Sequence, residues 1–324
     1  MDFDRLKGEK VLITGASGLI GRALTARLLK EGGIKVVACV RDLERAHSVF
    51  AGLPQENLEY LVGDVALLPI KDMGIGYIVH GANRTASKEF VSEPVEVIES
   101  AVNGTKRVLE FARVNRVKGL AYLSTMEVYG TPTTDGKITE NSPAVLDTMS
   151  VRSSYPESKR LCECLCAAYA SEYQVPARVV RLTQTFGPGV SYSDGRVFAE
   201  FARCAIEGRD IILKTKGETK RSYLFTEDAV TAILTVLLFG AAGEAYNAAN
   251  EETYCSVYDM AEMVAEQFGN GKTSVKICED DPQKYGYAPT LKMNLSTQKL
   301  RALGWKAETN LVKAYASMIA DMQK

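Results

Sequence analysis

The chain has 324 residues, 46% of them hydrophobic, and a formal net charge of -1 from 39 Lys and Arg against 40 Asp and Glu. This length and composition are enough for one large domain, or two joined ones, with a sizeable core, which excludes a disordered chain. The charge is near neutral and forms no long block of one sign, so we expect neither nucleic acid nor a membrane as a partner.

The first ten residues and the cysteines bear on the compartment. The sequence MDFDRLKGEK is charged and lacks the pattern of a secretory signal, so we expect a cytoplasmic protein. Residues 229–242 are the longest apolar stretch, too short to span a bilayer, and are predicted to be a buried helix. Cys162, Cys164 and Cys166 alternate in a predicted helix and cannot converge on one metal. We therefore predict reduced thiols and no metal site.

The first half of the chain alternates short β-branched segments with helical ones. Strands, apolar on both faces, are predicted at residues 10–14, 34–40, 58–62, 77–80 and 120–124. Helices are predicted at residues 19–31, 43–50 and 94–115, the last with a proline at its start. This alternation predicts an α/β fold with a doubly wound parallel sheet of the Rossmann type.

After residue 175 the alternation loosens. A strand at 178–182 is followed by a loop rich in Gly, Pro and Ser at 187–195, and then by helices and short strands in mixed order. We expect residues 1–176 to form mainly a dinucleotide-binding domain. Residues 177–324 are expected to form mainly a smaller α+β substrate lobe, with part of the chain returning to the sheet.

Three glycines spaced three residues apart lie between the first strand and the first helix. A tight turn, close approach of a pyrophosphate, and close packing of helix on strand all require glycine in such a loop. The strand before the loop and the helix after it make a dinucleotide site much more specific than the glycines alone would. The residues predicted to contact the cofactor here are Gly15, Ser17, Gly18, Leu19, Ile20 and Gly21.

The second strand leaves the choice between NAD and NADP open. An NAD enzyme usually ends this strand with an acid that holds the ribose hydroxyls, but Val40 stands there. Arg41 can pair with a 2′-phosphate and favours NADP, whereas Asp42 can still reach the ribose. Asp64, after the third strand, is predicted to accept a hydrogen bond from the adenine amino group, with Val65 beside it and Ala82 after the fourth strand as further cofactor contacts.

Tyr155 and Lys159 are four residues apart at the start of a predicted helix and share one face. A tyrosine is a poor base at neutral pH, and a nearby fixed cation stabilises its phenolate. Thr125 and Glu127 follow the fifth strand at its carboxyl end, where ligands of open α/β sheets bind. We predict that these four residues are catalytic, and that Tyr155 and Lys159 also contact the cofactor.

Together the glycine loop and the Tyr-Lys pair resemble the extended short-chain dehydrogenase/reductase family, also called the NAD-dependent epimerase/dehydratase family, over nearly the whole chain. The resemblance implies an enzyme that oxidises a nucleotide sugar at carbon 4 with a bound nicotinamide cofactor, and makes the substrate lobe a nucleotide-sugar-binding lobe. It also implies a homodimer formed by the helices that begin near Pro94 and Tyr155. If the cofactor is recycled in place, NAD is favoured over NADP.

Within this family the C-terminal half is most similar to UDP-glucuronate decarboxylases. The similar segments are residues 181–188, 193–198 and 221–225. They imply that Arg221 contacts the sugar diphosphate or the substrate carboxylate, that Arg196 shapes the nucleotide pocket, and that Gln184 contacts substrate. Gln184 stands where an asparagine is usual, and Ala101 also departs from the family pattern.

The residues around Thr125 favour one reaction by this resemblance. The 4,6-dehydratases use an Asp-Glu pair, in which the aspartate protonates the leaving hydroxyl, but Met126 cannot donate a proton. Decarboxylation needs no such acid. Our hypothesis is that Tyr155 takes the 4-hydroxyl proton during hydride transfer, that carbon dioxide leaves the resulting β-keto acid, and that returned hydride gives a UDP-pentose, with Glu127 positioning water or the ring.

Other functions remain open from the sequence. A 4-epimerase, or a 4-keto reductase that consumes NADPH, would use the same Tyr155 and Lys159. A non-enzymatic dinucleotide sensor would tolerate damage to the catalytic residues, and none is seen. Hydrolysis by a nucleophile and histidine fits poorly, because the two histidines are His47 in a charged helix and His80 at a strand end.

Overall fold

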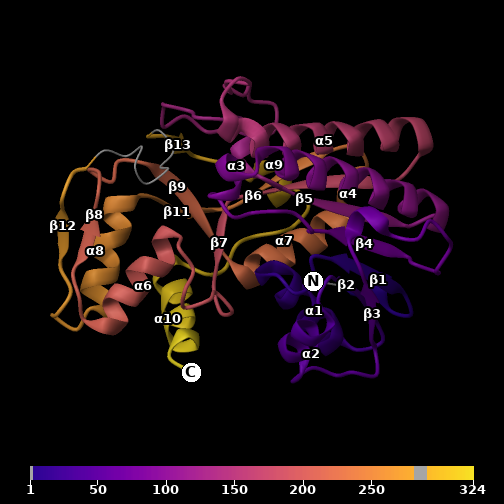
Figure 1. The fold of residues 1–324 in the computed structure, drawn as a ribbon, viewed down its shortest axis with the longest axis horizontal. Helices are drawn as coiled ribbons and strands as arrows, with labels where there is room; N and C mark the ends of the chain where they lie inside the picture. Colours follow the sequence, from indigo (N-terminus) through magenta and orange to yellow (C-terminus); the bar gives the residue numbers. More distant parts are fainter. Residues whose placement is uncertain (1–2, 281–289) are drawn as a thin grey trace.

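A seven-stranded parallel sheet forms the centre of the computed structural model, which describes residues 3–280 and 290–324 (Figure 1). The strand order is β10-β6-β5-β4-β1-β2-β3. The strands are β1 (Lys10–Thr14), β2 (Lys35–Val40), β3 (Leu58–Val62), β4 (Tyr77–His80), β5 (Gly119–Thr125), β6 (Ala177–Leu182) and β10 (Ala245–Ala248). The predicted doubly wound fold is confirmed, with strand ends within one residue of those expected.

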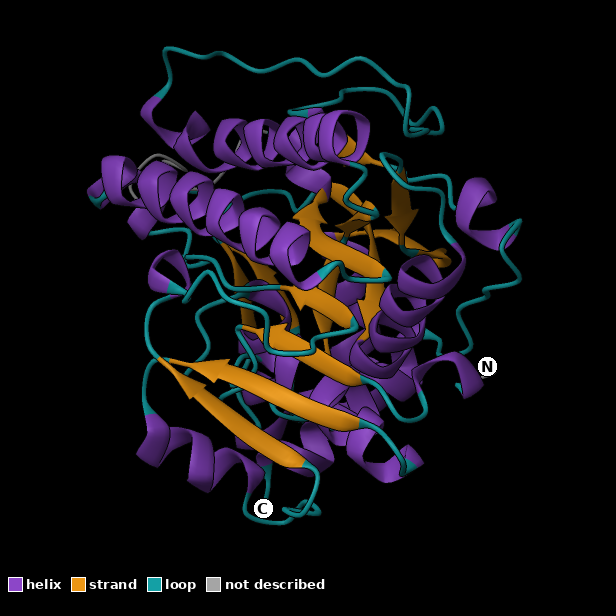
Figure 2. Ribbon diagram, turned by 90° about the vertical axis from the view of Figure 1, so that its right-hand side faces the viewer, coloured by secondary structure: helices purple, strands orange, loops and turns teal. Residues whose placement is uncertain are grey.

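Helices cover both faces of this sheet, which Figure 2 shows as one twisted layer. On one face lie α1 (Leu19–Glu31), α2 (Leu43–Phe50) and α7 (Thr226–Phe239), and on the other α4 (Pro94–Asn115) and α5 (Ser154–Tyr173). Strand β1 shows why both faces are apolar: Val11 and Ile13 join the first core and Leu12 joins the second. The helix predicted at 229–242 is α7, which begins earlier and ends before Gly240.

The C-terminal part of the chain builds a third core beside the large sheet. Strand β9 (Lys220–Phe225) pairs with β7 (Gln184–Phe186), β11 (Asn250–Ser256) and β13 (Lys292–Met293), and β8 (Ile211–Leu213) pairs with β12 (Val275–Ile277). Helices α6 (Val197–Glu207), α8 (Val257–Phe268) and α10 (Leu311–Met322) pack around Phe186, whose ring centroid lies 4.8 Å from that of Phe198. Two further helices, α3 (Glu89–Ser92) and α9 (Gln298–Arg301), are short.

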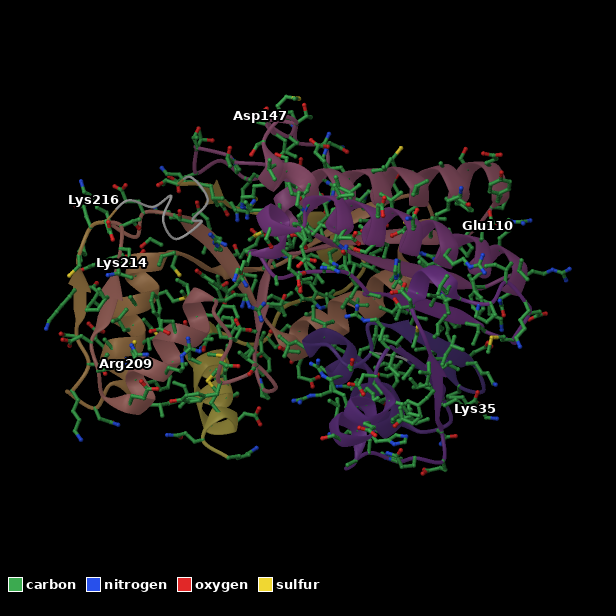
Figure 3. The ribbon with its side chains drawn as sticks, viewed as in Figure 1. Lys35, Glu110, Asp147, Arg209, Lys214 and Lys216 are labelled. Atoms are coloured by element: carbon green, nitrogen blue, oxygen red, sulfur yellow. The ribbon has the colours of Figure 1, made fainter. Side chains whose placement is uncertain are left out.

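Burial separates the side chains as the composition predicts. Charged residues such as Lys35 and Arg209 lie at the periphery (Figure 3), whereas Cys162 and Cys166 are buried on α5 and Cys164, on its opposite side, is exposed. Within residues 3–280 and 290–324, no helix combines the length and the apolarity needed to cross a membrane.

Candidate functional site

The loops that carry the predicted cofactor-binding and catalytic residues emerge at the carboxyl edge of the large sheet. Because all its strands are parallel, the loops after β1, β3, β4 and β5 emerge at the same edge. The chain order reverses between β1 and β4, since β1 continues outward to β2 and β3 while β4 continues to β5 and β6. A reversal of this kind opens the crevice in which open α/β sheets bind ligands.

The glycine loop lies at this reversal and leaves room for a dinucleotide. Gly15 has a φ of +70°, and a Cβ there would lie 2.8 Å from the Ala82 nitrogen. Gly21, the third residue of α1, is packed against the loop, and its Cβ would lie 2.2 Å from the Gly15 carbonyl oxygen. Gly18 caps α1 without a side chain, so the first N–H groups of the helix face the loop uncovered. These features fit a pyrophosphate at the amino terminus of α1.

Replacing Gly21 with alanine is expected to weaken NAD binding at least tenfold, because α1 and the loop must separate to admit the methyl group, at a cost of about 1–3 kcal/mol. Calorimetric titration with NAD measures the effect. Gly52→Ala is the control, since a Cβ at Gly52 meets no atom within 4 Å. Equal NAD affinity in the two variants would contradict this account of the loop.

The residues expected to select the nicotinamide cofactor lie at the ends of β2 and β3. Arg41 is exposed directly after β2. The Asp42 side chain caps α2, where it accepts a hydrogen bond of 2.9 Å from the Arg45 backbone nitrogen. Asp64 is also exposed and accepts one of 2.8 Å from the Ala66 nitrogen. Both carboxylates therefore help to fix their loops, whereas the Arg41 side chain is exposed at this end of the crevice.

His80, at the end of β4, is held beneath the site by two threonines. Its Nδ1 lies 2.7 Å from the Thr14 hydroxyl and its Nε2 lies 3.2 Å from that of Thr105. Burial, together with the nearby Lys159 charge, lowers the pKa of His80 to about 3. His80 is thus a neutral, packed strand residue, in line with the sequence argument against a catalytic histidine.

The pKa of His80 makes the protein sensitive to acid. Between pH 6.5 and pH 3 the unfolded chain binds a proton that the folded chain does not, so stability falls as the pH falls through this window. The contribution of His80 is at most about 1.4 kcal/mol per pH unit. Denaturant unfolding between pH 7 and pH 5 should show a shallower pH dependence for His80→Gln than for the wild type. Identical slopes would mean that His80 does not titrate in this way.

Tyr155 and Lys159 lie in the first turns of α5, as predicted, and both are buried. The Lys159 ammonium donates a hydrogen bond of 2.7 Å to the Leu123 carbonyl and lies 4.7 Å from the centre of the Tyr122 ring. Burial lowers the pKa of Lys159 to about 8. Lys159 is therefore fixed against β5, one helical turn along from Tyr155.

Thr125 and Glu127 lie beside Tyr155, where β5 passes into a short 3-10 turn over Met126–Tyr129. Burial raises the pKa of Tyr155 and the Glu127 charge raises it further, whereas the Thr125 side chain and the Arg152 charge lower it. The four predicted catalytic residues thus belong to one cluster. They supply a phenol, a hydroxyl, a carboxylate and an ammonium, which suits proton transfer to and from a bound alcohol.

Two residues of this cluster were not predicted from the sequence. The Phe90 ring stacks on the Tyr155 ring at 4.1 Å between centroids and an interplanar angle of 5°. Arg152 pairs with Glu127 at 2.9 Å. Arg152 lies in the 3-10 turn Val151–Ser153 just before α5, and its closeness to Tyr155 in the chain is the one signal that the sequence contained. Phe90 comes from α3, and no sequence pattern linked it to Tyr155.

The predicted substrate residues of the second lobe differ in whether their polar groups already have partners. Arg196 is exposed, pairs with Asp194 at 2.6 Å, and lies at the start of α6. Arg221 on β9 is half buried, and its Nε is buried with no hydrogen-bond partner among the described residues. Gln184 begins β7 and pairs in register with Tyr223 of β9. Arg221 is therefore the better placed of the two arginines to bind an anionic ligand.

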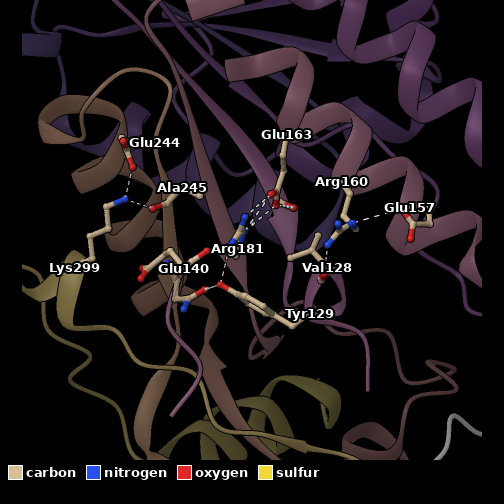
Figure 4. Close-up of polar contacts among 12 residues, drawn as sticks. Val128, Tyr129, Glu140, Glu157, Arg160, Glu163, Arg181, Glu244, Ala245 and Lys299 are labelled. Atoms are coloured by element: carbon tan, nitrogen blue, oxygen red, sulfur yellow. Dashed lines mark hydrogen bonds and ion pairs between the residues drawn. The ribbon is translucent and has the colours of Figure 1, made fainter. Parts of the chain in front are cut away.

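A buried ion pair supports the turn that carries Glu127 (Figure 4). Arg181 of β6 contacts Glu163 of α5 with Nη2 2.7 Å from Oε2, and its Nη1 donates to the Tyr129 hydroxyl at 2.8 Å. Ser124 donates to Glu163 at 2.5 Å. Ser124 precedes Thr125 and Tyr129 ends the 3-10 turn, so Arg181 and Glu163 anchor the strand end on both sides.

A cavity of about 300 Å³ adjoins this ion pair and is separate from the predicted site. It is lined by Tyr129, Glu140, Arg160, Glu163 and Arg181, among others, but by none of the glycines of the loop nor by Tyr155. Arg181 and Glu163 pair with each other in its wall, and Arg160 pairs with Glu157 outside the lining, so we assign the cavity a supporting role.

The fold and the Tyr-Lys cluster define a dinucleotide-dependent enzyme whose chemistry is proton and hydride transfer at an alcohol. Residues 11–249 match the model of the NAD dependent epimerase/dehydratase family, and the chain belongs to that family. It is therefore an enzyme that uses NAD, the cofactor favoured over NADP if it is recycled in place.

Curated relatives and a solved structure agree with this family. The chain is 28% identical to UDP-glucuronic acid decarboxylase 1 of Xenopus tropicalis over 92% of this chain and 68% of that protein. It is 29% identical to UDP-glucuronic acid decarboxylase 2 of Arabidopsis thaliana over 98% and 69%. UDP-glucose 4-epimerase of Thermotoga maritima, solved with UDP-glucose, superposes with a TM-score of 0.82 at 20% identity over 97% of this chain and 98% of that one.

Proposed function

We propose that this enzyme decarboxylates UDP-glucuronate to a UDP-pentose through oxidation at carbon 4. The observation that carries the proposal is the pair of residues after Thr125. Glu127 reaches the Tyr155 cluster, whereas Met126 is buried, and its sulfur accepts a hydrogen bond of 3.3 Å from Thr183. The site thus offers a carboxylate near the reacting carbons but no acid at the Met126 position to expel a hydroxyl. The names of the two curated relatives support the same substrate.

The residues of the chain have separate tasks in this reaction. NAD, when bound, accepts a hydride from carbon 4 and later returns it. Tyr155, as phenolate, takes the proton of the 4-hydroxyl, while the Thr125 hydroxyl hydrogen-bonds the same oxygen. After oxidation the sugar is a β-keto acid, and the bond to the carboxyl carbon breaks with its electron pair left on the sugar as an enolate. Tyr155 and Thr125 stabilise the enolate oxygen, and a water held by Glu127 donates a proton to carbon 5 in place of the lost carboxyl group; solvent replaces that proton. When hydride returns to carbon 4, Tyr155 gives its proton back to the 4-oxygen.

Incubation with NAD and UDP-glucuronate tests the proposal when carbon dioxide and cofactor absorbance are followed together. We expect carbon dioxide release with no net reduced cofactor. Accumulation of reduced cofactor with a keto product would contradict recycling. Turnover of UDP-glucose to UDP-galactose without carbon dioxide would instead identify a 4-epimerase. Consumption of NADPH with a keto sugar would identify a reductase, the function that Arg41 fits.

We also propose that the protein is a homodimer held together by α4 and α5. Val95 and Ile98 on α4 and Leu161 on α5 are 62%, 41% and 48% exposed, so these neighbouring helices present large apolar side chains that a second copy of the chain can cover. Light scattering after gel filtration should give twice the chain mass, and Val95→Glu with Ile98→Glu should give a monomer. A wild-type monomer at micromolar concentration would refute the dimer. The cytoplasmic location expected from the sequence stays a prediction.

A further inference from the structure

The ion pair between Glu127 and Arg152 joins two short turns that are distant in sequence. Glu127 belongs to the 3-10 turn after β5, and Arg152 to the 3-10 turn Val151–Ser153 that leads into α5. The Arg152 Nη1 lies 2.9 Å from the Glu127 Oε2, with the two side chains 31% and 27% exposed. The pair is therefore neither a core contact nor a fully solvated one. Both charges act on Tyr155, so the pair adjoins the Tyr155 cluster and is partly open to solvent.

Arg152 is fixed relative to Tyr155 by an aromatic ring. The guanidinium carbon lies 5.9 Å from the centre of the Phe90 ring, which in turn stacks on Tyr155. A guanidinium has five N–H donors, and the bond to Glu127 uses Nη1. Within the described ranges, 3–280 and 290–324, no other hydrogen bond from the Arg152 side chain is found. The remaining donors can therefore receive a second carboxylate.

The charges around Tyr155 require a cation such as Arg152 if the substrate is an acid. Glu127 alone would repel a carboxylate placed on the sugar next to the oxidised carbon, since two like charges in a partly buried site disfavour each other. Arg152 neutralises Glu127 and offers a fork of donors that matches carboxylate geometry. Because Arg152 also binds Glu127, it would bind the substrate carboxylate less tightly than an arginine without another partner would. A moderate hold suits a group that must lose its charge on departure as carbon dioxide.

We infer that Arg152 is the residue that selects a sugar nucleotide bearing a carboxylate over its neutral hexose counterpart, and that its guanidinium binds this carboxylate and Glu127 at the same time. The inference rests on the proposed function, of which it names the selecting residue. It assigns Arg152 to the uronate group, and leaves Arg221 of the second lobe as the candidate for the diphosphate.

Calorimetric titration of the NADH-loaded protein, which cannot oxidise carbon 4, with UDP-glucuronate, UDP-glucose and UDP tests this inference independently of turnover. In the wild type we expect UDP-glucuronate to bind more tightly than UDP-glucose. Arg152→Met should weaken UDP-glucuronate about 10- to 100-fold, the loss expected for a charge-assisted hydrogen bond. The affinities for UDP-glucose and UDP should change less than about twofold. Arg152→Lys, which keeps the charge but not the fork, should retain part of the preference.

The control is Arg113→Met, since Arg113 forms a surface ion pair with Glu110 on α4. It should leave all three affinities unchanged. A wild type without preference for the acid, an Arg152→Met variant that keeps the preference, or an equal loss for all three ligands would each overturn the inference. If the preference depends on Arg152 but no carbon dioxide is released, the inference stands and the proposed decarboxylation fails. If carbon dioxide is released and Arg152→Met keeps its preference, the proposed function stands and the inference fails.

Discussion

The substitution Tyr155→Phe is expected to lower kcat by about 10²- to 10⁴-fold, the usual contribution of a positioned acid-base group. The variant keeps the ring that stacks on Phe90 and removes only the hydroxyl that accepts the substrate proton. Binding of NAD and of UDP-glucuronate should therefore change little. Steady-state kinetics and titration with each ligand separate the two effects.

Tyr169→Phe provides the matched control on the same helix. Tyr169 is buried on α5 and bonds Glu110 through its hydroxyl at 2.8 Å, at a distance from the cluster at the start of the helix. Its loss should cost stability but not kcat. Comparable kcat values in Tyr155→Phe and Tyr169→Phe would remove Tyr155 from the mechanism, provided that circular dichroism shows both variants folded.

Loss of the Arg181 side chain is expected to have the largest effect on stability. Arg181→Met leaves Glu163 as an uncompensated charge that is only 11% exposed, which costs about 3–5 kcal/mol. Denaturant unfolding measures this loss. Turnover should fall as well, because Arg181 and Glu163 hold Tyr129 and Ser124 on either side of Thr125 and Glu127.

A double-mutant cycle tests whether the charge pair causes the loss. Glu163→Leu combined with Arg181→Met removes both charges, and should be more stable than the single variant Arg181→Met. Arg27→Met is the surface control, since Arg27 pairs with Glu31 on α1 with the two side chains 35% and 31% exposed, and should lose only about 0–1 kcal/mol. A loss of that small size in Arg181→Met would show that Arg181 is not an anchor for the turn.

Sequence patterns predicted the large sheet and the tight glycine turn between β1 and α1. Strands such as β1 and β4 are short and apolar on both faces. The glycines at 15, 18 and 21 are needed because a side chain there would crowd the backbone of any loop of this shape. The placement of Tyr155 and Lys159 on neighbouring turns of α5 follows from helical spacing alone. These features are local, so the residues that define them are close in sequence.

The features that the sequence did not predict depend on contacts between distant segments. Phe90 reaches Tyr155 from α3, and Arg181 reaches Tyr129 from β6, with no spacing rule linking either pair. The small sheet of the second lobe also combines strands that are far apart, because β7, β11 and β13 all pair with β9. Periodicity within one segment carries no information about which other segment lies beside it.

The strand order of the large sheet has a consequence for how the chain folds as it is synthesised. The first 176 residues contain the whole glycine loop and both Tyr155 and Lys159, but not the last two strands, β6 and β10. They also lack α7, whose fully buried Ile233 and Val236 belong to the same core as Val11 and Ile13. A ribosome that has made only this half has produced a sheet with one apolar face only partly covered, by α1 and α2, and with one edge unpaired. The same core also includes Leu300 and Trp305, so the cofactor-binding half completes its own core only after Trp305 has left the ribosome.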